Sequence, residues 1–289
     1  MTETGARDPD SAVDADSTVA GATPTEETDA TRSETGAVDA GTRVDLHVKI
    51  LNEQVVARAK ARGIDVLVYA PHFTRLPEIR ARAERFSDDD LLVVPAREVF
   101  TGTWHDRRHL LAVGLSDPVP DFISLSGAFD AFRRQDAAVL VPHPQFLNVS
   151  LDADEIRTHR DRLHAIETHN LKLFERQNRR ARRLAREVDR PGFGSSYAHL
   201  LGSVGEVWTT FDREIDSAAE LVAALRDGAA RSVFRRDGPQ HTARGLAEFA
   251  HLGYENTWSK LDRIFLSGTE PTHPSHVAYD GRFDDVRMY

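Results

Sequence analysis

Two hydrophobic patterns take turns along this chain. Short apolar runs rich in Val, Leu and Ile predict buried strands, and stretches with apolar residues three and four positions apart predict amphipathic helices. The predicted strands are 43–48, 64–70, 91–100, 109–115, 137–141, 164–170, 191–199 and 205–211. The helices predicted between them are 52–63, 76–86, 128–135, 154–163 and 171–188.

This alternation is typical of an α/β protein with parallel strands and crossover helices, in a sheet that is either closed or open. After about Gly238 the pattern changes to one more helix, over 242–266, and an irregular end rich in Pro, His and Asp. We therefore expect a folded body over 43–237 and a helical C-terminal extension over 238–289.

The first 42 residues differ from the rest of the chain in composition. They contain ten acidic residues, two arginines and no aromatic residue, whereas the remainder of the chain has a net charge of only −1. Such a segment cannot bury enough apolar surface to order itself, so we expect a disordered acidic tail over 1–42. With only four lysines in the chain, the acidic tail also favours a salt-loving, haloarchaeal source.

Composition excludes several classes of protein. No apolar run is long enough to span a membrane and the N-terminus lacks an apolar signal core, so we expect a cytoplasmic protein. The chain has no cysteine, which excludes disulfides and thiolate metal sites. A metal ion would have to be bound by Asp, Glu or some of the 13 histidines.

The predicted strands carry candidate metal ligands at or near their ends. One example is His143, which follows the apolar run 138–141 and lies between two prolines. In a barrel of parallel strands the C-terminal strand ends converge on one face, where imidazoles and a carboxylate would suit zinc, manganese or iron. The residues with this placement are His47, His72, Glu98, His143, His169 and His199.

At these positions the sequence resembles the polymerase and histidinol phosphatase (PHP) superfamily of metal-dependent phosphoesterases. The resemblance covers about residues 43–212. It is carried by "DLHVK", "APHFT", "PAREVFTG", "RRHLLAVGL", "VPHP" and "SSYAH", in this order. It implies a distorted (β/α)7 barrel resembling a TIM barrel, which hydrolyses phosphate esters with divalent metal ions.

Three positions depart from the family pattern. Lys49 stands where the first motif has its second histidine, and Pro71 and Tyr197 stand where two motifs have aspartate. The resemblance therefore implies a reduced site with about one to two divalent ions per chain. The ligands that it implies are His47, His72, Glu98, His109, His143 and His199.

Cations near these ligands could bind the phosphate group of a substrate. Lys49, Arg75 and Arg97 are the candidates, since guanidinium groups bind phosphate in a bidentate way. Alternatives are also open: Glu98 could form a salt bridge with Arg97 or Arg75, and Lys49 could be a surface residue. The arginines of 171–188 are typical of the solvated face of an amphipathic helix, so nucleic acid is expected only as a substrate.

Two function classes follow from these residues. The first is a metal-dependent phosphoesterase that acts on a small phosphorylated substrate. The second is a catalytically impaired barrel that binds a phosphorylated ligand or partner, which the three departed positions favour. The sequence leaves the identity of the phosphate ester and the oligomeric state open.

Overall fold

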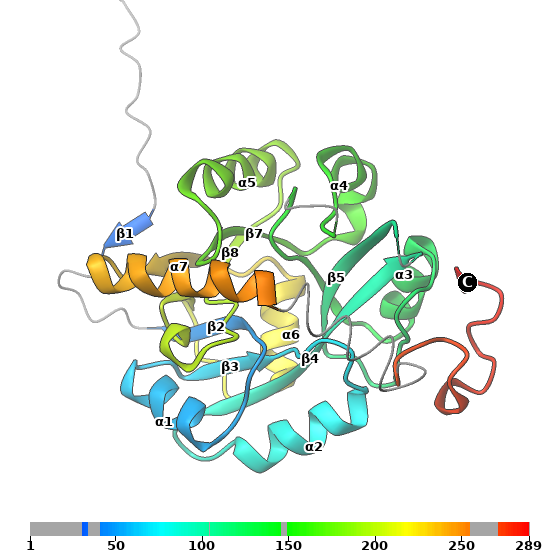
Figure 1. Ribbon diagram of the computed structural model, residues 1–289, viewed down its shortest axis with the longest axis horizontal. Helices are drawn as coiled ribbons and strands as arrows, with labels where there is room; N and C mark the ends of the chain where they lie inside the picture. Colours follow the sequence, from blue (N-terminus) through cyan, green and yellow to red (C-terminus); the bar gives the residue numbers. More distant parts are fainter. Residues whose placement is uncertain (1–30, 34–40, 104, 146–148, 255–270, 289) are drawn as a thin grey trace, which may run out of the picture.

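The computed structural model describes residues 31–33, 41–103, 105–145, 149–254 and 271–288, and Figure 1 shows their arrangement. The strands are β1 (Thr31–Ser33), β2 (Thr42–Val48), β3 (Val66–Tyr69), β4 (Leu92–Gly102), β5 (Arg107–Val113), β6 (Ala138–Val141), β7 (Ala165–Asn170), β8 (Gly192–Ser195), β9 (Val207–Phe211) and β10 (Arg231–Arg235). The α-helices are α1 (Glu53–Ala61), α2 (Leu76–Phe86), α3 (Leu125–Arg134), α4 (Ala153–His159), α5 (Glu175–Glu187), α6 (Ala218–Arg226) and α7 (Pro239–Tyr254).

All ten strands belong to one sheet, in the order β1-β10-β9-β2-β3-β4-β5-β6-β7-β8. The sheet curls until β8 approaches β9, where the Thr209 hydroxyl donates to the Gly194 carbonyl and accepts from its N–H. A bridge between Val48 and Ala198 adds a contact to β2. The expected distorted barrel is thus confirmed as a mixed α/β fold around a nearly closed sheet.

The sequence pattern predicted parallel strands, but some of the strands are antiparallel. β5 runs antiparallel to both β4 and β6, and β9 runs antiparallel to β2 and β10. The link between β4 and β5 runs only from 103 to 106. A parallel pair needs a crossover of a dozen or more residues, so this short link forces a hairpin.

Helix α6 closes one end of the barrel. Its buried residues Leu221, Ala224 and Leu225 pack in the same cluster as the inward-facing Val44 and Leu46 of β2. Neither α6 nor β10 was among the predicted elements. β10 has only two apolar residues, Val233 and Phe234, between polar ones, whereas the mostly apolar α6, with Glu220 as its one charged residue before Arg226, was overlooked. The polar side chains of the barrel interior lie toward the end away from α6.

The two ends of the chain differ from the sequence-based expectations. β1 lies inside the segment expected to be a disordered tail and pairs in parallel with β10. Backbone pairing at a sheet edge needs no apolar side chains, so composition alone did not exclude this strand. Helix α7 begins at Pro239, earlier than predicted, and the predicted continuation over 255–266 lies outside the described residues.

Candidate metal centre

Alternation along β4 decides which side chains reach the barrel interior. Glu98 is fully buried and faces the histidines of β2, β5 and the β6–α4 loop, whereas its neighbour Arg97 points to the opposite face. There the Arg97 guanidinium donates to the Thr74 carbonyl at 2.7 Å and pairs with Asp121 at 3.0 Å. Successive residues of a strand point to opposite faces, so Glu98 and Arg97 cannot share one site.

One oxygen of Glu98, Oε1, lies among three imidazole nitrogens. His109 Nε2 is 3.1 Å away, His47 Nε2 3.5 Å and His143 Nε2 3.7 Å. The Nε2 atoms of His109 and His143 are themselves 3.1 Å apart. Four donor atoms therefore converge from β2, β4, β5 and the end of β6.

The other oxygen, Oε2, contacts a cation and a fourth imidazole. The Lys49 ammonium lies 2.5 Å from it and also donates to the Ala70 carbonyl at 2.7 Å. His72 Nδ1 lies 2.7 Å from the same oxygen. Lys49 is buried rather than on the surface, and the carboxylate pairs with Lys49 rather than with Arg97 or Arg75.

A second row of polar groups holds His143 in place. Its Nδ1 contacts the Ser150 hydroxyl at 2.8 Å, and its backbone N–H donates to Glu167 at 2.6 Å. Glu167 in turn accepts from Asn170 at 3.0 Å and from the Ser195 hydroxyl. His143 has φ +30°, a conformation rare for a residue with a side chain. Such strain is tolerated where the surroundings fix the residue, as they do here.

The electrostatics keep the donor groups in the forms that bind metals. Burial lowers the pKa of His143, and burial with the Lys49 ammonium lowers the pKa of His47 well below its usual value. Burial alone would raise the pKa of Glu98, but Lys49 and the imidazoles, led by His109, hold it well below its usual range. Neutral imidazoles and an ionised carboxylate are the states that metal ligands must adopt.

The donor set fits a divalent metal ion. Glu98, His109 and His143 offer ligand atoms within 4.8 Å of one another. Bonds of about 2.0–2.1 Å in a tetrahedral site place ligand atoms roughly 3.3 Å apart, close to the distances around Glu98 Oε1. Glu98 Oε1 and His47 Nε2 are buried without a hydrogen-bond partner, which is unfavourable unless another group meets them.

A second polar cluster lies beside this centre. The Lys172 ammonium is 2.7 Å from His199 Nδ1 and 3.5 Å from Glu248 Oε2 of helix α7. Glu248 also accepts the backbone N–H groups of His199 and Leu200 at 3.0 and 2.8 Å. The ring of Tyr197, with φ +48°, lies between the two clusters, 4.7 Å from His47 and 4.9 Å from His199.

Sequence reasoning missed Lys172 and Glu248. Lys172 follows the end of β7 by two residues, but a single lysine in a basic stretch gives no signal. Glu248 lies on a helix beyond the resemblance, and only the packing of α7 on the barrel brings it to His199. Asp45, two residues before His47, accepts the N–H groups of Ser196 and Gly205. Burial raises the pKa of Asp45 to about 6.

The structure brings together six of the sequence-predicted site residues, and a seventh, His199, lies beside them. Glu98 is surrounded by five of them, His47, Lys49, His72, His109 and His143, and the ring of His199 lies 5.7 Å from that of His72. Arg75 and Arg97 lie outside this cluster. Arg75 pairs with Glu78 on helix α2 at 2.6 Å, and Arg97 is committed to Asp121.

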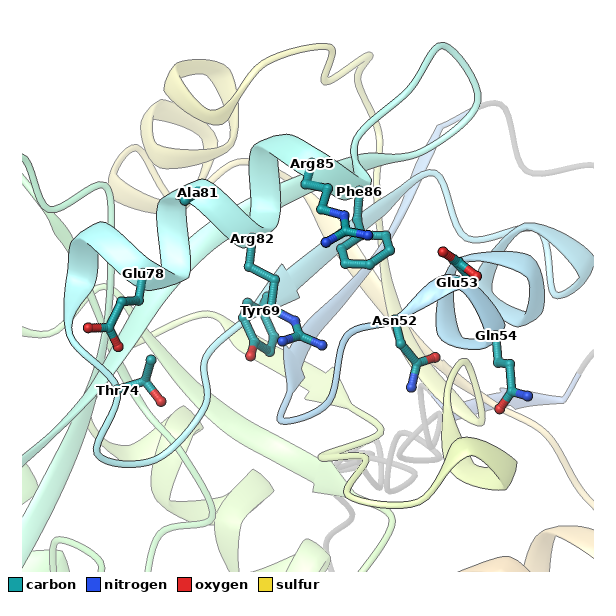
Figure 2. Close-up of a pocket in the computed structure, with 10 residues that line it drawn as sticks. All are labelled: Asn52, Glu53, Gln54, Tyr69, Thr74, Glu78, Ala81, Arg82, Arg85 and Phe86. Carbon is teal, nitrogen blue, oxygen red and sulfur yellow. The ribbon is translucent and has the colours of Figure 1, made fainter. Parts of the chain in front are cut away.

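A groove of about 870 Å³ lies on the outer side of the barrel, between helix α2 and the start of α1. Figure 2 shows Arg82, Arg85 and Phe86 of α2 facing Asn52 and Glu53. None of the metal-ligand candidates lines it. The groove is therefore separate from the centre around Glu98.

Comparison with known proteins found one matching family model and several solved structures with a similar fold. A family model described as PHP-associated matches residues 175–230. The fold is similar to the crystal structure of PsfC from Pseudomonas syringae, with 14% sequence identity, a TM-score of 0.56, and coverage of 74% of this chain and 98% of that one. No curated protein sequence matches the chain significantly.

A second solved structure is also similar. It is a two-domain protein from Bacteroides vulgatus that contains a predicted PHP-like metal-dependent phosphoesterase, with 16% identity, a TM-score of 0.51, and coverage of 75% of this chain and 73% of that one. The molecule is thus an α/β barrel with a histidine and carboxylate centre in its interior. The PHP-associated match over residues 175–230 and the similarity of the fold agree with the resemblance seen in the sequence.

The structure also bears on membrane association. Among the described residues, no helix combines the length and apolar character needed to cross a membrane.

Proposed function

We propose that the protein is a metal-dependent phosphoesterase that hydrolyses a small phosphorylated substrate. The observation that carries this proposal is the convergence of His47, His109 and His143 on one oxygen of Glu98, with distances of 3.1–3.7 Å. We propose one to two divalent ions per chain, zinc, manganese or iron, and Glu98 with these histidines as the ligands. When bound, such an ion activates a water molecule and neutralises charge on the phosphoryl oxygens.

The chain's own groups would supply the rest of the chemistry. The Lys49 ammonium, beside Glu98, would attract phosphoryl oxygens as a fixed positive charge. His72 is 21% exposed, whereas the side chains of His47, His109 and His143 are at most 2% exposed. His72 is therefore the imidazole placed to exchange protons with solvent at the mouth of the site. We no longer assign phosphate to Arg97, whose guanidinium is buried on the opposite face of β4.

We also propose that residues 43–237 and the C-terminal extension act together. Glu248 of α7 accepts N–H groups beside His199, and the Asp121 N–H donates to the Thr272 carbonyl at 2.8 Å. The extension therefore packs beside the centre at His199 and, through Thr272, on the loop between β5 and α3. A chain truncated after β10 would lack the carboxylate nearest to Lys172.

The direct test is to measure metal content after purification without chelator and to screen phosphate esters in the presence of zinc, manganese and iron. We expect about one to two ions per chain and metal-dependent hydrolysis. Protein that repeatedly binds none of these metals would contradict the proposal. The His159→Ala variant is a control, because His159 lies on α4 and packs against Phe129 outside the cluster.

The second candidate function is a barrel that binds a phosphorylated ligand without hydrolysing it. It is favoured by Lys49, which occupies the second oxygen of the one carboxylate in the centre. The Lys49→His variant separates the two. If Lys49 holds phosphate, the variant should bind inorganic phosphate about tenfold to a hundredfold more weakly at unchanged metal content.

The opposite result has an equally clear meaning. If Lys49 only replaces a metal ligand, the new imidazole should raise the metal content, and hydrolysis should rise with it. A variant that changes neither metal nor phosphate binding would remove Lys49 from the proposed site.

A further inference from the structure

Glu206 is a second buried carboxylate, and it lies outside the metal centre. It directly precedes β9, and its side chain is fully buried. Oε1 pairs with Arg62 at 2.8 Å and with Arg244 of α7 at 2.5 Å. Oε2 accepts from His241 at 2.9 Å. Burial alone would raise the pKa of Glu206, but His241 and the two arginines hold it below its usual value.

A third arginine joins this cluster without a carboxylate of its own. Arg58 on α1 donates to the Gly202 carbonyl at 2.6 Å, and its Nε is buried without a hydrogen-bond partner. Arg236 lies close by and donates to the Gly205 and Arg62 carbonyls at 3.2 Å each. Among the described residues, Arg58, Arg62 and Arg244 have one carboxylate, Glu206, as their shared counter-ion.

This arrangement leaves an excess of positive charge. Three guanidinium groups and one carboxylate carry a net charge of +2. Burial, with Arg244 and Arg236 beside it, lowers the pKa of Arg58, and burial and the neighbouring arginines lower that of Arg62. Like charges held together in a partly buried site repel one another, and an added anion relieves that repulsion.

The cluster is open to solvent and lies near the metal centre along the chain. The Arg62 and Arg244 side chains are 15% and 27% exposed. The 3-10 turn Leu201–Ser203, whose Gly202 carbonyl accepts from Arg58, begins two residues after His199. Glu248 follows Arg244 by four residues, about one turn of α7, and contacts the backbone of His199.

We propose that Arg58, Arg62 and Arg244 form an anion-binding site for a phosphate group, separate from the metal centre. Guanidinium groups present paired N–H donors that match phosphate oxygens, and the buried Nε of Arg58 offers a donor that the protein itself does not satisfy. The phosphate can be a free ion or a second phosphate of a longer ligand that also reaches the metal centre.

Isothermal titration of the full-length, metal-loaded protein with inorganic phosphate tests the site. The Arg58→Gln variant should bind phosphate about tenfold more weakly, because it loses one charged donor. The Glu206→Gln variant should bind more tightly, because it removes the competing carboxylate while retaining its shape. Arg157→Gln is the matched control: this exposed arginine of α4 pairs with Glu187 and Asp154, and its loss should leave affinity unchanged.

A short 5′-phosphorylated oligonucleotide distinguishes the two sources of phosphate. If a second phosphate of a longer ligand is bound, the oligonucleotide should bind more tightly than inorganic phosphate, and Arg58→Gln should remove that advantage. If free phosphate is the ligand, Arg58→Gln should weaken both equally. Equal phosphate affinity in wild type, Arg58→Gln and Glu206→Gln would overturn the proposal.

This test is independent of the proposed hydrolysis. Neither Arg58 nor Glu206 belongs to the metal centre, so both variants should retain the metal content of the wild type. Loss of metal would indicate a folding defect, which thermal melting would reveal. Arg58→Lys, which retains the charge but not the fork of donors, then tests the same contact with less disturbance.

Discussion

Glu98 and Glu206 are both fully buried carboxylates, but their neighbours differ in kind. Glu98 faces four imidazoles and one ammonium, and its Oε1 has no hydrogen-bond partner. Glu206 faces arginines and one histidine, and both of its oxygens accept hydrogen bonds. Glu98 keeps one oxygen without a hydrogen bond among the imidazole nitrogens, whereas the charge of Glu206 is already neutralised by arginines.

The difference indicates which ligand each region can take. Imidazole nitrogens have lone pairs that bind a cation, so the surroundings of Glu98 suit a metal ion. Guanidinium groups have only donors and a permanent positive charge, so they repel a metal ion and attract an anion. A buried carboxylate is thus a candidate metal ligand in the region of Glu98 and a counter-ion in the region of Glu206.

The largest effect should come from neutralising Glu98. Glu98→Gln leaves the Lys49 ammonium buried without a counter-charge, and breaking such a pair costs about 3–5 kcal/mol. We expect loss of metal together with a large fall in the urea midpoint. Glu206→Gln should also lower stability but retain the metal.

The surface carboxylate Glu78 provides the control. It is half exposed and pairs with Arg75, so Glu78→Gln should change stability by only about 0–1 kcal/mol. Equal metal content in Glu98→Gln and the wild type would remove Glu98 from the ligand set.

A smaller effect is expected from His143→Ala. Its removal takes one donor from Glu98 Oε1 but leaves no unpaired buried charge. Metal content and melting temperature should fall together, since a ligand at a hundred times its Kd stabilises by about 2.7 kcal/mol. His159→Ala should change neither. Chelator added to the wild type and to His143→Ala should remove the part of their difference in melting temperature that metal binding contributes. A lower melting temperature at full metal occupancy would show that His143 acts only through packing.

The sequence predicts the region around Glu98 better than the region around Glu206, because strand positions bring the first together and tertiary packing the second. His47, Glu98 and His143 lie on strands whose alternation and ends can be read from apolar runs, so their convergence follows from a barrel. Arg97 was assigned with them only because it is adjacent, and the pleat of β4 places it on the opposite face. Counting alternate residues from Glu98 would have excluded it.

The region around Glu206 has no such signal. Its residues come from the end of α1, the loop before β9 and the start of α7, and only tertiary packing joins them. Glu248 was missed for the same reason. The antiparallel β5 was predictable from the short link after Gly102, whereas β1 was not, because an edge strand paired through its backbone needs no apolar pattern.

The regions around Glu98 and Glu206 should lose their contributions to stability over different pH ranges. In metal-free protein the pKa values of His47 and His143 lie below their usual value. The unfolded chain, with histidine pKa values near ~6.5, then binds more protons below that pH. The stability contributed by these neutral imidazoles is therefore present above about pH 6.5 and is lost as the pH falls.

The contribution of Glu206 to stability is lost at a lower pH than that of the histidines. Its pKa is lowered, so its stabilisation is present above the usual carboxyl pKa and is lost only as the pH falls through the folded value. Urea unfolding of chelator-treated protein should show a decline that starts near pH 6.5 and is shallower in His143→Ala. An equal slope in both proteins would contradict the titration of His143.

The smallest effect should come from removing residues 1–30, which contain eight acidic residues and one arginine. This deletion retains β1, which pairs with β10 next to Arg236. Melting temperature and metal content should stay unchanged, because neither centre includes these residues. Phosphate affinity at the arginine cluster should rise severalfold at low ionic strength, since β1 pairs with the strand directly before Arg236 and the deletion removes a net charge of −7 from the chain that leads into β1. Salt should abolish the gain, because screening at about 0.1 M confines such forces to roughly 10 Å. A deletion variant that loses metal instead would place the acidic segment at the Glu98 centre and reverse the contrast between the two regions.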